Sequence, residues 1–83
     1  MPQTIVDREE LRAALADILD IDIAQIADGT QFTAELGIDS LMALELLVEL
    51  ERRYGVRIAE DRLREITSLE TAHALLVAEL SGT

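Results

Sequence analysis

The fold is decided by residues 37–55, which read GIDSLMALELLVELERRYG. Asp39 and Ser40 are residue types that favour the start of a helix, and Gly55 easily adopts the left-handed conformation that ends one. We therefore predict a helix over residues 40–54. Its main apolar stripe, at helical spacing, consists of Ala43, Leu46, Leu47, Leu50 and Tyr54.

Three more apolar residues of this helix, Leu41, Leu44 and Val48, fall outside the stripe. The apolar arc is therefore wider than one buried face requires. Two interpretations stay open at this point. These side chains are either exposed for contact with a partner protein or packed against the preceding loop.

Upstream of this helix, residues 7–19 predict a first helix that is followed by a long loop. Asp7 and Glu10 have the spacing of a capping box. The apolar residues of the helix recur at helical spacing: Leu11, Ala14, Leu15, Ile18 and Leu19. Residues 20–39 lose this spacing and predict a long loop, which a set of apolar residues anchors to the core: Ile21, Ile23, Ile26, Phe32, Leu36 and Ile38.

Downstream, residues 60–65 predict a short helical segment, with Leu63 and Ile66 facing inward. Thr67 and Glu70 have the spacing of a second capping box, before a last helix with the apolar stripe Leu69, Ala72, Leu75, Leu76 and Leu80. No alternating strand pattern and no repeat is present. The sequence therefore predicts an all-α fold: a small four-helix bundle of three longer helices and one short helix, with a long first loop.

Length and composition exclude several functional classes. The 83 residues, 9.2 kDa in all, allow one domain over residues 1–83, with a core of about residues 7–80. A net charge of −10 argues against nucleic acid or an anionic membrane as a partner. Without Cys there is no disulfide or thiolate zinc site. We find no signal peptide or membrane-spanning run, and we expect a cytoplasmic monomer.

The acidic residues are unevenly distributed. No basic residue stands between Arg12 and Arg52, whereas this interval holds nine Asp and Glu residues, and no Lys occurs in the chain. These nine carboxylates have no counter-charge nearby in the sequence. Such a run is either a solvated surface or a docking surface for basic partners.

The sequence offers no catalytic or metal-binding constellation. His73 is the only His and lies within the last predicted helix, so we interpret it as a surface or packing residue. Ser40 lacks the flanking glycines of a Gly-x-Ser-x-Gly nucleophile elbow. A calcium loop that started at Asp20 would place Gln25 and Gln31 where the EF-hand pattern requires Gly and Glu.

The chain nevertheless resembles the acyl carrier protein family over about residues 7–80. The resemblance rests on ELGIDSL at residues 35–41, LERRYG at residues 50–55 and ITSL at residues 66–69. It is supported by the loop anchors Ile21, Ile26 and Phe32, and by Glu45, Leu46 and Ile58. The size, the acidity and the order of the helices agree with it.

This resemblance implies that Ser40 carries 4′-phosphopantetheine, which a phosphopantetheinyl transferase transfers from coenzyme A. Gly37, Asp39 and Leu41 then flank the cofactor, whose thiol holds an acyl group as a thioester. The chain is in that case a protein substrate and carrier, not an enzyme. By family analogy, the helix over residues 40–54 is the recognition surface, with Met42, Glu45, Val48 and Glu49 as partner-binding residues.

Two positions in the sequence, Met42 and Ile38, bear on the pathway in which such a carrier would act. Fatty-acid members of the family often have an acidic residue where Met42 stands, which favours a polyketide-type carrier whose partners include an acyltransferase or ligase and a ketosynthase. A peptidyl or aminoacyl carrier is an alternative, although such carriers commonly have a second Gly at the position of Ile38. A second alternative is an acidic helical adaptor without a prosthetic group. Met1 and the short tail suggest a discrete protein, although a domain excised from a synthase would look the same.

Overall fold

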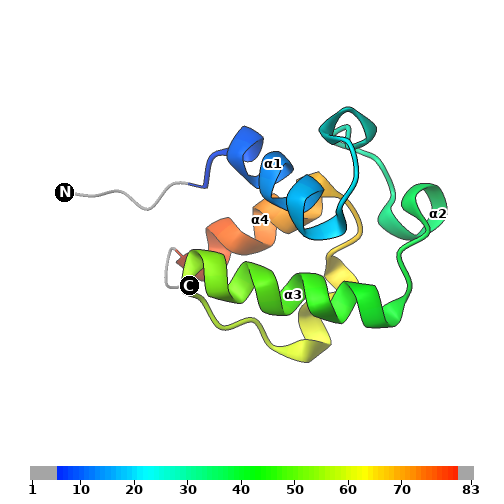
Figure 1. The fold of residues 1–83 in the computed structure, drawn as a ribbon. Helices are drawn as coiled ribbons and strands as arrows, with labels where there is room; N and C mark the ends of the chain where they lie inside the picture. The colour runs from blue at the N-terminus through cyan, green and yellow to red at the C-terminus, as the bar shows by residue number, and fades with distance from the viewer. Residues whose placement is uncertain (1–5, 81–83) are drawn as a thin grey trace.

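The computed structural model describes residues 6–80, and within them it contains four α-helices, two 3₁₀ helices and no strand. The all-α class is therefore confirmed. No helix among these residues is long and apolar enough to cross a membrane. In chain order the elements are α1 (Arg8–Leu19), the 3₁₀ helix η1 (Ile23–Gln25), α2 (Phe32–Leu36), α3 (Ser40–Tyr54), the 3₁₀ helix η2 (Glu60–Glu65) and α4 (Leu69–Leu80) (Figure 1).

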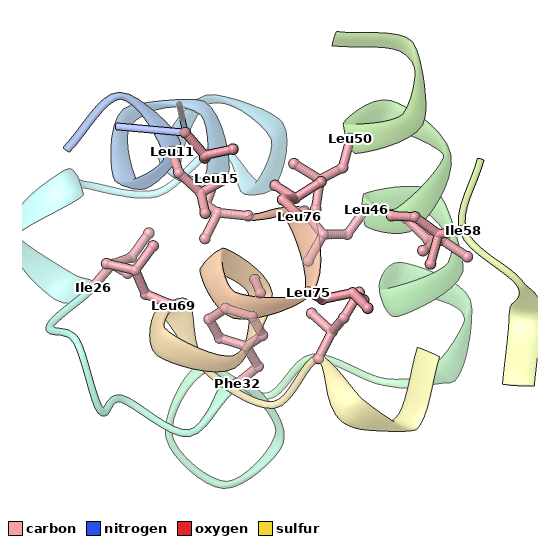
Figure 2. Close-up of a cluster of buried hydrophobic side chains, with 14 of the residues drawn as sticks. Leu11, Leu15, Ile26, Phe32, Leu46, Leu50, Ile58, Leu69, Leu75 and Leu76 are labelled. Carbon is pink, nitrogen blue, oxygen red and sulfur yellow. The ribbon is translucent and has the colours of Figure 1, made fainter. Parts of the chain in front are cut away.

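The three longer helices pack around one aliphatic core. Helix α1 contacts both α3 and α4, and η2 also contacts both of these helices. Figure 2 shows leucines from all three helices meeting in the interior, and the fully buried side chains include Leu11, Leu15, Leu46, Leu50, Leu69 and Leu76. The stripes predicted for these helices supply most of this core. Burial of these side chains is the main force that holds the helices together.

The long connection between α1 and α3 is present, but η1 and α2 interrupt it. Ile26, Phe32 and Ile38 are buried as predicted, whereas Ile23 is 43% exposed, so its prediction as an anchor is wrong. The Phe32 N–H donates to the Thr67 carbonyl (2.9 Å), which fastens α2 to the segment before α4. Helix α2 has only five residues and no side-chain cap, so the sequence carries little signal for it.

Helix caps differ in detail from the two predicted capping boxes. Asp7 caps α1, but its carboxylate accepts from the Glu9 N–H (2.9 Å) instead of the Glu10 N–H. Helix α4 begins one residue later than the Thr67–Glu70 pair requires. There Ser68 Oγ accepts from the Thr71 N–H (3.4 Å), and Thr71 Oγ1 accepts from the Thr67 N–H (2.9 Å). The hydroxyl pair satisfies the first turn, and no capping box forms with Glu70.

The acidic interval acquires counter-charges through the fold. Arg12 bonds Asp28 (2.6 Å), and Arg53 of α3 bonds Asp17 of α1 (2.7 Å). Asp17 and Asp28, two of the nine carboxylates without a counter-charge nearby in the sequence, therefore gain one in space, because packing brings distant arginines to them. The Arg12 guanidinium also donates to Glu9 and to the Ile26 carbonyl (2.6 Å). Its hydrogen bonds lower the pKa of both Glu9 and Asp28.

Candidate functional site

Ser40 is the first residue of α3, and its side chain is exposed. The Asp39 carboxylate accepts from the Met42 N–H (2.9 Å) and caps the helix as predicted. Just before it, Gly37 ends α2 in the left-handed conformation (φ 68°), and the Ile38 N–H donates to the Phe32 carbonyl (3.1 Å). The cap on one side and the buried Ile38 on the other therefore fix Ser40 on a rigid helix start.

Ser40 is the accessible one of the two serines that the described residues contain. Ser68 is only 3% exposed, and its hydroxyl is occupied by the contacts with Thr71. A hydroxyl that is to receive a bulky group must reach solvent and the active site of another enzyme. Within the described residues, Ser40 meets this requirement and Ser68 does not.

A groove of about 480 Å³ opens beside Ser40. It runs between the start of α3 and η2, and Ser40, Asp39 and Ala43 form its α3 side. The remaining lining combines apolar side chains, two hydroxyls and two charges: Ile38, Leu63, Ile66, Thr33, Thr67, Glu60 and Arg64. From the sequence, Thr33, Glu60 and Arg64 were assigned to no site, because their positions relative to Ser40 depend on how α2 and η2 pack.

The predicted partner-binding residues share the solvent-facing side of α3. Val48 is 44% exposed and Met42 37%, Glu45 is exposed, and Glu49 is partly exposed beside Arg52 (3.5 Å). We call the set Leu41, Met42, Leu44, Glu45, Val48 and Glu49 the α3 outer face. Leu41 (65% exposed) and Leu44 (36%) belong to it. Of the two interpretations of the wide apolar arc, the structure supports exposure for Leu41, Leu44 and Val48.

Among residues 6–80, no histidine lines the groove beside Ser40. His73 lies on α4, where its Nε2 is 2.7 Å from the Val6 carbonyl oxygen, and it does not line the groove. It is a packing residue that ties the chain before α1 to α4. Residues 6–80 also hold no group of three or more His, Asp or Glu side chains that could bind a metal ion.

Comparison with known proteins identifies the family. The family model described as "Phosphopantetheine attachment site" matches residues 9–76. The "Polyketide-8 synthase acyl carrier protein 2" of Streptomyces avermitilis is 48% identical over 86 residues, which cover 100% of this chain and 99% of that protein. The chain belongs to the acyl carrier protein family. An "Acyl carrier protein" of Helicobacter pylori (strain G27) is 34% identical over 61 residues, covering 74% of this chain and 78% of that protein.

Membership of the acyl carrier protein family confirms several of the predictions. The chain is a non-catalytic carrier, and its prosthetic group is covalently attached 4′-phosphopantetheine. The site described above fits such a group, because it offers an exposed hydroxyl and an open groove next to it. An acyl carrier protein interacts with a phosphopantetheinyl transferase and with enzymes that use acyl thioesters.

Proposed function

We propose that Ser40 is the attachment residue for 4′-phosphopantetheine. The observation that carries this proposal is accessibility. Within the described part of the 9–76 match, Ser40 is the exposed serine and Ser68 is buried. Gly37 and Asp39 set the start of α3 on which Ser40 stands, and Leu41, at 65% exposure, adjoins it on the open side.

The local electrostatics support this assignment. A phosphodiester on Ser40 would lie at the first turn of α3, where the helix dipole is positive and some backbone N–H groups have no helical partner. The Asp39 carboxylate is engaged by the Met42 N–H, which reduces its repulsion of a neighbouring anion. The chain itself orients the hydroxyl, and the transferase provides the base.

We propose that the cargo is an acyl intermediate of polyketide or related natural-product biosynthesis. The Streptomyces avermitilis relative, which spans the whole chain, is named for a polyketide synthase. The arm supplies the thiol that holds the acyl group, since this chain has no Cys. Under this proposal the partners are an acyltransferase or ligase and a ketosynthase. A cytoplasmic location, a monomeric state and a single carrier domain over residues 1–83 stay predictions.

We also propose that the α3 outer face is the docking surface for these enzymes. It combines exposed apolar side chains with two carboxylates, Glu45 and Glu49, next to the modified residue in the chain. Hydrogen bonds and ion pairs occupy Asp17, Asp28 and Asp39 elsewhere, whereas Glu45 has no such partner within the described residues. A basic enzyme surface would therefore meet an available carboxylate here.

The attachment residue can be tested by incubating the protein with coenzyme A and a broad-specificity phosphopantetheinyl transferase. We expect the intact mass to rise by one phosphopantetheine group in the wild type and not in Ser40→Ala. Thr33→Ala is the matched control, because Thr33 carries a hydroxyl that lines the same groove. This control should be modified like the wild type. An adduct on Ser40→Ala, or none on the wild type, would contradict the proposal.

A further inference from the structure

Two of the seven arginines differ from the others in having no ion pair within residues 6–80. Ion pairs hold Arg8, Arg12, Arg52, Arg53 and Arg62, all within 4 Å of a carboxylate. In residues 6–80, Arg57 and Arg64 have neither an ion pair nor a side-chain hydrogen bond, although the chain holds 17 Asp and Glu residues. Contacts within the described residues therefore give no structural role to these two guanidinium groups.

The two unpaired arginines differ in what they face. Arg64 belongs to η2 and lines the groove that contains Ser40, where it is the cation among the lining residues. Arg57 lies before η2 and lines a different groove, which includes Leu44, Val48 and Glu51 but not Ser40. Within residues 6–80, one arginine without an ion pair therefore lies in the groove of Ser40 and one lies away from it.

Attachment of a phosphodiester would add a permanent negative charge to the groove of Ser40. Two carboxylates, Asp39 and Glu60, already line that groove, and both disfavour a further anion. A guanidinium forms charge-assisted, often bidentate hydrogen bonds with phosphate oxygens. The side chain of Arg64 has no competing partner within the described residues, so it can turn toward the phosphate without breaking an existing contact.

We propose that Arg64 binds the phosphodiester that joins the prosthetic arm to Ser40 and so directs the first part of the arm along the α3–η2 groove. This inference rests on the proposed attachment at Ser40. A carboxylate on the carried acyl group offers similar chemistry to a guanidinium. The proposal assigns the contact to the phosphodiester, so the contact forms in the holo protein before any acyl group is loaded.

The test compares the wild type, Arg64→Gln and Arg57→Gln, each converted to the holo form and checked by intact mass. We expect the Nε–H NMR signal of Arg64 to shift between the apo and holo proteins, while that of Arg57 does not. The ³¹P signal of the holo protein should shift in Arg64→Gln and stay in place in Arg57→Gln. The ³¹P difference should shrink at high salt, because screening weakens an exposed contact.

The outcomes separate the two proposals. If no adduct forms on Ser40, the attachment proposal fails. If the adduct forms but the Arg64 signal does not move and the ³¹P signal is the same in all three proteins, only the role of Arg64 is wrong. A shift of Arg64 that appears only after loading with a dicarboxylic acyl group would overturn the assignment to the phosphodiester. Circular dichroism of both variants should match the wild type, since neither side chain has a partner in the described residues.

Discussion

Two charged residues that join elements on the α1 side differ from two on the α3–η2 side in whether they have a partner within the fold. On the α1 side, Arg12 bonds Glu9, Asp28 and a backbone carbonyl, and Arg53 reaches across to Asp17. On the α3–η2 side, Glu45 and Arg64 have no ion pair among the described residues, and Leu41 is 65% exposed. Arg12 fastens the connection between α1 and α3 to α1, and Arg53 joins α3 to α1, so both stabilise the fold. Glu45 and Arg64 are available to other molecules.

Under the proposed function, this difference explains how a small acidic domain can dock with its partner enzymes and still stay folded. Groups that already have partners cannot bind another protein without loss of an internal contact, whereas unpartnered groups can. We therefore expect substitutions on the α1 side to change stability and substitutions on the α3–η2 side to change recognition. The predictions below test that division.

The largest effect is expected from a matched pair of leucine truncations. Leu15→Ala removes a side chain that is 0% exposed and should lower the free energy of unfolding by about 2–5 kcal/mol. Leu41→Ala removes a side chain that is 65% exposed and should change it by no more than about 0.5 kcal/mol. Urea denaturation measures both. Equal losses of unfolding free energy for the two variants would contradict the division between residues that stabilise the fold and residues that are available for recognition.

Charge reversal on the α3 outer face should have the second largest effect, on the rate of modification. Glu45→Arg with Glu49→Arg should slow modification by a phosphopantetheinyl transferase by roughly tenfold, because the variant repels a basic enzyme surface. Helicity should change little. Glu10→Arg, an exposed acid on α1 without an ion pair among the described residues, is the control and should be modified at the wild-type rate. If the double variant is as fast as the control, the acidic face is only a solvated surface.

Loss of the Arg12 contacts should have a smaller effect on stability. Arg12→Gln removes the donor to the Ile26 carbonyl and leaves the Asp28 carboxylate with the contact from Arg8 alone (3.2 Å). We expect the Tm to fall by roughly 4–8 °C. Arg64→Gln is the matched variant on the other side and should leave the Tm of the apo protein within about 2 °C of the wild type. Calorimetry that gave the reverse order would contradict the account.

The smallest effect concerns pH. Arg12 lowers the folded-state pKa of Glu9 and Asp28 below their ordinary values of 4.5 and 3.8. Their contribution to stability is therefore present above those values and is lost as the pH falls through the lower folded-state values. The difference in Tm between the wild type and Arg12→Gln should shrink between pH 7 and pH 3. A difference that stayed constant or grew on acidification would show that these carboxylates do not stabilise the fold.

The predicted helix bounds were most accurate where residues with a strong preference for helix caps stand at both ends. Asp39 and Gly55 delimit α3, and the structure has the helix at the predicted residues 40–54 with both caps in place. Residues 60–65 also form a segment with the predicted bounds, although it is a 3₁₀ helix. Helix α2 was missed because five residues without a side-chain cap leave almost no periodic pattern.

The contents of the site were predicted only along α3. Gly37, Asp39 and Ser40 lie within four consecutive residues, so a local motif could identify them. Thr33, Glu60 and Arg64 reach the groove through the packing of α2 and η2, which no local pattern encodes. The same holds for the ion pair between Asp17 and Arg53, which are far apart in the sequence.

The position of the prosthetic group on the unaltered protein can be determined directly. The wild type, modified with coenzyme A and a phosphopantetheinyl transferase, would be digested and fragmented by tandem mass spectrometry. We expect a single phosphopantetheine group, and fragment ions that assign it to Ser40. Assignment of the group to Ser68 or to any other residue would contradict the proposed attachment at Ser40.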